Sequence, residues 1–539
     1  MATTLIVLPA DLLALIISYV RAPPDLRNVS LTCKALYAVA VVPIYRTMTL
    51  RLSWLEADNR QLLQALVPEN AALLCVRHIV IDRFSHCYEK NTEKLLMTLQ
   101  LLANLLPRDI LISLTLDSLI SYEARTLLIS SVSSILEILY RRQRQLRTMR
   151  VDSYASAWQV RRYANLANVT TLQFEISSTA TAETCGSVLQ HTPYLRNLEI
   201  RGHLEKYDSG SSKDQMSAHL VGRVFGSLLK KDRRIVLRAL QVRGLDLSLA
   251  SAKLASAIDL SQIDSLGLHM CSNMVDFLGQ MTPIGTLLRP SLRTLVLIDR
   301  PDSLGSGSVG NDSSGVAAVD NLLGSFIGLE NLVVAAPDQR ALMPGFKALG
   351  NHVATLRLLY IDCLPLPSSA NDANVVTASN LHLLLRQCIQ LEQIALEMPQ
   401  LLLTYHEDEI ERTLEQFAVA LAAAPRLRTF QPNNKLKDRL DIEDDLDANE
   451  VTYAGIDSVL QHWATDLMSL IPKLTAVGLA FRSAELRGIW VNPHYYVRGN
   501  LSDPYGRKST AALQVTLKQL REIEPVSEIL DINPYGPGL

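Results

Sequence analysis

The chain has 539 residues, of which 48% are hydrophobic and 20% are charged, and its formal net charge is −2 at pH 7. This length exceeds what a single compact core usually supports, so several domains or a repeat array are expected. The nearly neutral charge gives no general attraction to nucleic acid or to a membrane surface, and neither is expected as a partner.

Residues 8–50 read as a small helical module. Pro9 suits the first turn of a helix. Leu8, Leu12, Ile16 and Tyr19 share one stripe at helical spacing, which Leu13 and Ile17 widen. Asp25 fits as the cap of a second helix, along which the apolar residues are Leu26, Val29, Cys33 and Leu36. About 40 residues cannot bury all of this apolar surface by themselves, so part of it must face a partner or the next domain.

The module resembles an F-box, the helical motif that docks a receptor onto the Skp-type adaptor of cullin–RING (SCF) ubiquitin ligases. The resemblance rests on the Leu-Pro opening at 8–9, the Leu-Leu and Ile-Ile pairs at 12–13 and 16–17, and Val-Ser-x-x-Cys-Lys at 29–34. Asp11 replaces the more usual Glu, and Tyr45 stands where the family often has Trp. The resemblance implies that the adaptor-binding residues are Leu8, Pro9, Leu12, Ile16, Ile17, Val29 and Cys33. A helical cap on a larger domain would give a similar apolar pattern.

Beyond residue 50 one pattern keeps returning: an apolar residue, two others, an apolar residue, one other, and an apolar residue. Its copies begin at Val76, Leu111, Leu146, Val169, Leu195, Leu237, Ile263, Leu292, Leu329, Leu356, Leu391 and Leu474, with a partial copy at Leu427. This spacing is typical of leucine-rich repeats, in which each unit is a short strand followed by a returning helix. Segments 93–106, 122–141 and 409–424 are expected to be such helices. An ordinary α/β sheet domain also alternates strand and helix and is the alternative.

The predicted fold class is therefore α/β. We expect an F-box at 1–50, an irregular leucine-rich-repeat solenoid at 51–480 with a curved parallel sheet and helices outside, and a capping segment at 481–539. The inner apolar positions, such as Leu198, Leu240, Leu295 and Leu332, should be buried. A helix is expected at 510–523.

Catalytic and cofactor motifs are weak. Residues 305–310 match Gly-x-Gly-x-x-Gly, but 299–304 separate them from the preceding strand, and Asp312 would repel a phosphate. The histidines form no metal-binding motif, and no nucleophile motif appears. We therefore expect no enzyme activity, no cofactor and no metal.

Two basic clusters precede repeat strands, one at Arg141, Arg142, Arg144, Arg147 and Arg150, the other at Lys230, Lys231, Arg233, Arg234 and Arg238. Arginine captures phosphate or carboxylate well, so the clusters are candidates for recognising an acidic or phosphorylated partner. Solvated helix ends would carry the same residues. The acidic stretch 438–450 and the loops 207–214 and 302–315 read as solvated insertions.

The expected function is substrate recognition in an SCF-type ubiquitin ligase, with the F-box on the adaptor and the repeats on a target protein. A non-catalytic repeat scaffold outside ubiquitin transfer is the alternative. The target is expected on the inner sheet surface or near the C-terminal segment, at Arg196, Arg293, Arg357, Trp490, Tyr495 and Tyr496. Seven dispersed cysteines indicate reduced thiols in the cytoplasm or nucleus. The apolar run at 5–20 has no basic region before it and is interrupted by Pro9 and Asp11, which argues against a signal peptide.

Overall fold

The computed structural model describes residues 8–20, 23–51, 66–82, 89–116, 135, 137–151, 166–176, 178–202, 213–229, 234–248, 254, 256–281, 292–299, 313–336, 342–362, 377–396, 407–433, 453–479, 485–486, 489–490, 493–502 and 505–532. The chain divides into two compact units. Unit 1 holds Met1–Leu237 and Ala252–Ile258, and unit 2 holds Arg238–Ser251 and Asp259–Leu539.

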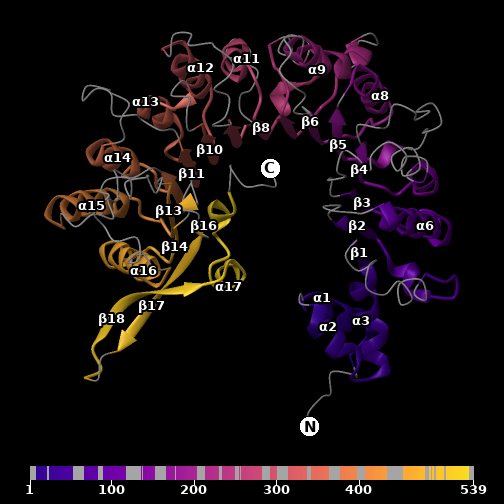
Figure 1. Cartoon of the computed structure of the whole chain (residues 1–539), viewed down its shortest axis with the longest axis horizontal. Helices are drawn as coiled ribbons and strands as arrows, with labels where there is room; N and C mark the ends of the chain where they lie inside the picture. Colours follow the sequence, from indigo (N-terminus) through magenta and orange to yellow (C-terminus); the bar gives the residue numbers. More distant parts are fainter. Residues whose placement is uncertain are drawn as a thin grey trace. The chain divides into compact units, whose positions relative to one another are not determined.

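Unit 1 begins with three helices and continues into a parallel sheet (Figure 1). The helices are α1 (Ala10–Ser18), α2 (Pro23–Ser30) and α3 (Lys34–Arg46). The strands follow in sheet order as β1 (Thr47–Arg51), β2 (His78–Asp82), β3 (Ser113–Leu116), β4 (Thr148–Val151), β5 (Thr171–Ile176) and β6 (Asn197–Gly202). Between and after the strands lie η2 (Ala71–Cys75), α6 (Glu89–Leu105), η6 (Leu166–Asn168), α8 (Thr179–Gln190) and α9 (Lys213–Leu229).

Unit 2 repeats the parallel strand-and-helix scheme. Its parallel strands are β7 (Ala239–Arg243), β8 (Ser265–His269), β9 (Thr294–Ile298), β10 (Asn331–Ala335), β11 (Leu358–Asp362), β12 (Gln393–Leu396), β13 (Thr429–Pro432) and β14 (Ala476–Leu479). The connecting helices are η7 (Leu260–Gln262), α11 (Met274–Met281), α12 (Ser313–Gly324), α13 (Phe346–Leu349), η10 (Gly350–His352), α14 (Ala378–Leu385), α15 (Glu407–Ala422) and α16 (Tyr453–Leu470). Helices α13 to α16 lie together on one side of their strands (Figure 1).

The end of unit 2 departs from the repeat. A hairpin pairs β17 (His494–Ser502) with β18 (Lys508–Val515), and β17 runs antiparallel to β14. A separate two-stranded pair joins β15 (Glu485–Leu486) to β16 (Ile489–Trp490). The chain then forms α17 (Leu517–Ile523) and η12 (Glu528–Asp531). We call residues 516–532 the C-terminal strap.

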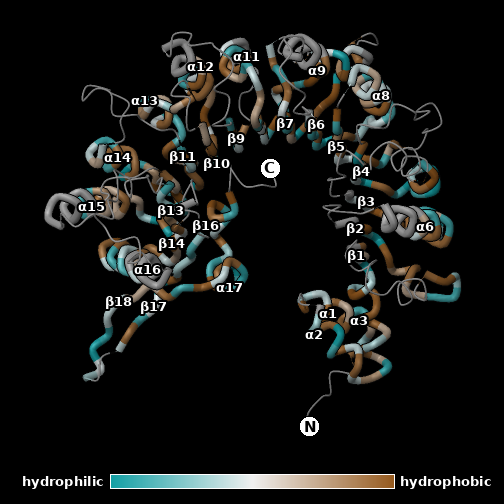
Figure 2. The backbone as a smooth tube through the Cα atoms, viewed as in Figure 1, coloured by the Kyte–Doolittle hydropathy of each residue, from teal (hydrophilic) through white to brown (hydrophobic). Residues whose placement is uncertain are grey.

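The thirteen predicted repeat strands are confirmed as β2 to β14. Because side chains alternate between the two sides of a strand, the apolar positions of each pattern face the helices and become the core. Leu198, Leu240, Leu295 and Leu332 are all buried, as predicted. Figure 2 shows hydrophobic residues along strands such as β10, whereas the helices alternate between hydrophobic and hydrophilic stretches.

The helix predictions fared less evenly. Helices α6 and α15 confirm the segments expected at 93–106 and 409–424, while most of 122–141 lies outside the described residues, with 137–142 helical at its end. The helix expected at 510–523 is wrong in its first half, because Thr510 to Val515 belong to β18. Thr516 caps the shorter helix by accepting the backbone N–H of Gln519. The local periodicity of the sequence did not indicate that this stretch would pair with β17 and form a strand.

Candidate functional site

The three N-terminal helices share a small core of their own. Leu13 and Ile17 of α1, Leu26 of α2, and Leu36 and Ala40 of α3 are buried together. Pro9 is the residue before α1 rather than part of its first turn, and its carbonyl accepts the N–H groups of Leu12 and Leu13. The core therefore fixes which face of α1 is turned inward.

The remaining apolar residues of α1 face solvent. Leu12 is 46% exposed and Ile16 40%, whereas their neighbours Leu13 and Ile17 are 4% and 3% exposed. With Tyr19, which follows α1 and is also exposed, they form what we call the α1 surface: Leu12, Ile16 and Tyr19. An apolar stripe left in water beside a formed core is typical of a docking surface.

The structure separates the seven expected adaptor-binding residues into three groups. Pro9, Leu12 and Ile16 are exposed, while Leu8, Val29 and Cys33 are partly buried and pack against the module core. Ile17 is a core residue and presents almost no surface, so its expected contact role is corrected. The apolar residues of α1 occupy both faces, and the sequence pattern alone does not select the inner one.

The second predicted helix is in fact two. Helix α2 begins at Pro23, so Asp25 lies in its first turn instead of capping it, and the helix ends at Ser30. The hydroxyl groups of Ser30 and Thr32 donate to the carbonyls of Arg27 and Val29, which closes this end. Cys33 then stands before α3, which carries Leu36. Two exposed apolar residues near this break, Leu31 and Tyr37, were not predicted.

The three arginines expected at the target site are exposed. Two of them pair within the chain: Arg293 Nη1 lies 3.0 Å from Glu330 Oε1, and Arg357 Nη2 lies 2.8 Å from Glu392 Oε2. Beside Glu392 the pKa of Arg357 is raised, because the hydrogen bond and the carboxylate charge both favour the guanidinium. For Arg196, the described part of the chain holds no ion pair.

The C-terminal strap covers the side of the unit 2 sheet opposite the helices. Leu520, Ile529 and Leu530 are buried against strand residues such as Val333 and Tyr360. In Figure 1, α17 lies across the strands from α14 to α16. The part of the inner sheet surface that was expected to hold the target is thus occupied by the chain itself.

Polar contacts fasten the strap along three strands. Thr429 Oγ1 donates to Val526 O at 2.9 Å, and the N–H of Ile529 donates to Gln393 Oε1 at 2.8 Å. Glu524, whose side chain is only 3% exposed, accepts from Arg428 Nη2 and Thr475 Oγ1, both at 2.7 Å. A buried carboxylate is tolerated because both of these donors satisfy it.

The three aromatic residues expected to bind the target near this segment differ in their surroundings. Tyr496 of β17 is buried and offers no contact surface, which corrects its expected role. Tyr495 packs against the buried residues between the strap and the sheet, and burial raises the pKa of its hydroxyl. Trp490 lies in β16, and its side chain is outside the described residues.

The first basic cluster does not act as one patch. Arg142 donates to the carbonyls of Ala103, Asn104 and Leu106 at the end of α6, where a cation also suits the helix dipole. Arg150 is buried and pairs with Glu175 at 2.8 Å, and Arg141 pairs with Glu137. Arg144 and Arg147 are left exposed. In the second cluster, 230–233 lie outside the described residues, and Arg234 and Arg238 are exposed.

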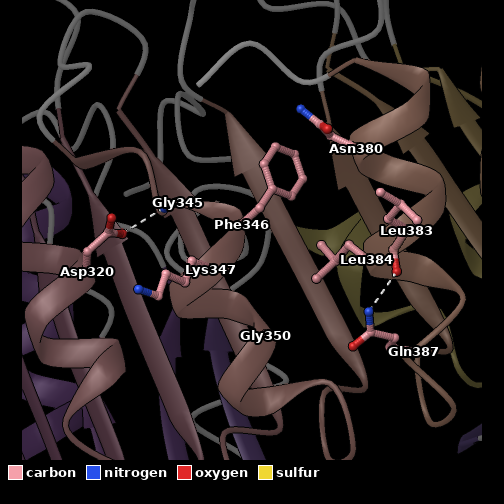
Figure 3. Close-up of a pocket in the computed structure, with 9 residues that line it drawn as sticks. All are labelled: Asp320, Gly345, Phe346, Lys347, Gly350, Asn380, Leu383, Leu384 and Gln387. Atoms are coloured by element: carbon pink, nitrogen blue, oxygen red, sulfur yellow. Dashed lines mark hydrogen bonds between the residues drawn. The ribbon is translucent and has the colours of Figure 1, made fainter. Parts of the chain in front are cut away.

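A hollow of about 470 Å³ lies among α12, α13 and α14 (Figure 3). Asp320 reaches toward the loop before α13, where its Oδ1 accepts the N–H of Gly345 at 2.7 Å. A Cβ at position 345 would stand 2.7 Å from Asp320 Oδ2, so any larger residue there would displace the carboxylate. Gln387 is likewise bonded internally, to Leu383 O at 3.2 Å. The hydrogen bond of Asp320 thus ties α12 to the start of α13, whereas that of Gln387 stays at the end of α14.

Reactive groups do not converge within the described residues. No cluster there of three or more His, Cys, Asp or Glu side chains has the arrangement of a metal site. Burial raises the pKa of Cys271 and of Cys388 to about 12, so these thiols stay protonated at neutral pH. The glycine-rich segment 305–310 lies outside the described residues. No helix in the described part of the chain is long and apolar enough to cross a membrane.

Comparison with known proteins bears on the N-terminal module. The F-box-like family profile matches residues 5–51, and no curated protein matches the chain. Among solved structures, the Rad7 and Elc1 complex in yeast is similar at 14% identity with a TM-score of 0.33, over 74% of this chain and 92% of that chain. The profile covers α1 to α3 and β1, the segment whose helices share a core and expose the α1 surface. Residues 5–51 are therefore an F-box-like domain, and a strand-and-helix repeat region follows it.

Proposed function

We propose that the chain is the substrate-recognition subunit of an SCF-type cullin–RING ubiquitin ligase. In this role the F-box-like domain binds a Skp-type adaptor, and the repeats hold a target protein. Other subunits would carry out ubiquitin transfer, while this chain raises the effective concentration of the target beside the charged conjugating enzyme.

The observation that supports the proposal best is the α1 surface. Its residues belong to a domain that matches the F-box-like profile, and they stay exposed although the core beneath them is complete. Removing such apolar side chains from water upon binding is favourable, and a few central residues carry most of the energy of an interface.

The test is the double variant Leu12→Gln/Ile16→Gln in the full-length chain. Glutamine keeps the helix propensity of α1 but removes the apolar contact, so the fold should persist. Affinity for a purified Skp-type adaptor should fall by about thirtyfold or more, equivalent to about 2 kcal/mol. Leu383→Gln is the matched control, because Leu383 is an exposed leucine on α14, far along the sequence. Unchanged affinity in the double variant would reject the proposed interface.

A second measurement separates the ligase role from a scaffold role. If the chain is a ligase receptor, affinity purification from cells should recover cullin together with the adaptor, and both should disappear with the double variant. If the adaptor is recovered and cullin never is, the ligase role fails and a non-catalytic scaffold is favoured.

A further inference from the structure

One residue per repeat stands just before each strand, and within each unit these residues form a row at one edge of the sheet. In unit 2 these residues are Arg238, Asp264, Arg293, Glu330, Arg357, Glu392, Arg428 and Thr475. From Asp264 onward, the backbone N–H of each donates to the carbonyl of the one before it, at 2.7–2.9 Å. We call these residues, and their equivalents in unit 1, the edge row. Neighbours in the row stand about one strand spacing apart, roughly 4.8 Å.

Charges alternate in sign along the edge row of unit 2. Two of the arginines bind the glutamate of the following repeat, as Arg293 does Glu330 and Arg357 does Glu392. At Arg428 the alternation ends, because the next residue is the neutral Thr475. There the C-terminal strap supplies the missing acid, and Glu524 binds both Arg428 and Thr475 at 2.7 Å. An arginine–threonine step of the row is thus a carboxylate site, filled by a residue from outside the repeats.

The edge row of unit 1 contains the same step without an acid. Its residues are Arg77, Ile112, Arg147, Thr170 and Arg196, linked by backbone hydrogen bonds of 2.7–2.9 Å. At Arg147–Thr170 the geometry repeats that of Arg428–Thr475. The threonine N–H donates to the arginine carbonyl at 2.9 Å in one and 2.8 Å in the other, and the hydroxyl lies 3.4 and 3.0 Å from that carbonyl.

The two arginines on either side of Thr170 have no acidic partner in the described part of the chain. Arg147 and Arg196 are both exposed, and neither forms an ion pair there. The charged residues on the neighbouring strands are already matched: Arg150 binds Glu175 at 2.8 Å, and Arg201 binds Glu199 at 2.7 Å. Arg77 is engaged as well, since its Nη1 donates to the carbonyls of Leu74 and Val76. The unmatched positive charge in this part of the row therefore lies at Arg147 and Arg196, on either side of Thr170.

We propose that Arg147, Thr170 and Arg196 form a site for a carboxylate side chain of an acidic protein segment, which lies across the edge row of unit 1 as the C-terminal strap lies across that of unit 2. Arg147 and Thr170 donate to the carboxylate as Arg428 and Thr475 do to Glu524, and Arg196 adds a second cation one strand further on. That the acidic segment belongs to a ubiquitination target rests on the proposed function, whereas the carboxylate site itself does not.

The test measures binding of a fluorescent ten-residue peptide of alternating Glu and Ser to the full-length chain at low salt. A peptide with Gln in place of Glu, and one with phosphoserine in place of Ser and Gln in place of Glu, are the comparison probes. The Glu peptide should bind, and added salt should weaken it. Arg147→Gln or Arg196→Gln should each weaken it about three- to tenfold, and Thr170→Val about threefold.

Arg223→Gln is the matched control, because Arg223 is an exposed arginine of unit 1 that already holds Glu183. It should leave peptide affinity unchanged, and all four variants should keep the thermal stability of the wild type. Equal weakening by Arg223→Gln, equal binding of the Gln peptide, or no binding of the Glu peptide would each overturn the site. Binding of only the phosphoserine peptide would overturn the carboxylate assignment. Adaptor affinity, measured on the same variants, tests the proposed function separately and should not change.

Discussion

His352 shows how a single buried group ties stability to pH. The N–H of Leu329 donates to its Nδ1 at 3.3 Å, and its Nε2 lies 3.0 Å from the carbonyl of Leu323. A neutral ring with its proton on Nε2 satisfies both contacts. A charged ring would also carry a proton on Nδ1, which would point at the N–H of Leu329 and break that hydrogen bond. Burial accordingly lowers the pKa of His352 from the usual value of 6.5.

The free energy of unfolding should therefore fall as the pH drops below 6.5. In that range the unfolded state binds a proton that the folded state resists, so His352 contributes a slope of at most about 1.4 kcal/mol per pH unit until the folded pKa is passed. His78 adds a slope of the same sign, since burial and nearby arginines lower its pKa too. Urea unfolding between about pH 7.5 and 5.5 should show a shallower slope for His352→Gln. An unchanged slope for His352→Gln would show that His352 does not carry this pH dependence.

Glu524 is the residue on which the end of the unit 2 edge row depends. Glu524→Ala should lower the free energy of unfolding by about 1–2 kcal/mol. The carboxylate loses three hydrogen bonds, from Arg428, Thr475 and the N–H of Val526, while the half-exposed Arg428 can turn to water. Glu524→Gln should recover part of this loss. Hydrogen exchange should quicken at 516–532 in the alanine variant, and an unchanged exchange rate would show that the strap is held by its apolar contacts alone.

At the scale of single elements, β14 is shaped for the strap. Gly478 has no side chain, and a Cβ there would collide with Cδ2 of Leu530, which is buried between the strap and the sheet. Glycine in the interior of a strand often marks such a close approach. Gly478→Ala should therefore push Leu530 out of its place and destabilise unit 2 by about 1–3 kcal/mol.

A double-mutant cycle checks this contact. Leu530→Ala opens the space that a methyl group at position 478 would need, so the double variant should be less destabilised than the sum of the two single variants. Strict additivity in urea unfolding would mean that residue 478 does not meet the strap.

The repeat core gives a second prediction at this scale. Leu332 of β10 is fully buried between the sheet and its helices, and Leu332→Ala should lower the free energy of unfolding by about 2–5 kcal/mol. Replacement of the exposed Ile327 by Ala is the control and should change it by no more than about 0.5 kcal/mol. A similar cost for both would contradict the assigned core.

At the scale of the whole molecule, the two proposed surfaces should act independently. The α1 surface and the Arg147–Thr170–Arg196 site share no residue, and substitutions with no shared partner usually add in their effects. Leu12→Gln/Ile16→Gln should lose the adaptor and keep the acidic peptide, while Arg147→Gln should do the reverse. Loss of both ligands in either variant would point to a general failure of unit 1 to fold.

The sequence alone determined the repeat strands and the F-box-like module, because each depends on local spacing. Apolar residues that recur as Leu329, Leu332 and Val334 do must turn to the core of a strand-and-helix repeat, whatever the rest of the chain does. The same reasoning placed α6 and α15 to within a few residues.

The tertiary structure decided what local spacing leaves open. Both faces of α1 are apolar, and only packing against α3 determined that Leu13 and Ile17 form the core while Leu12 and Ile16 remain outside. The pairing of Arg428 with Glu524, 96 residues apart, depends on the path that carries the strap back over the sheet. No pattern within a repeat encodes a contact with a segment outside the repeats. The covered face of unit 2 and the unmatched arginines of unit 1 could therefore be recognised only in the folded structure.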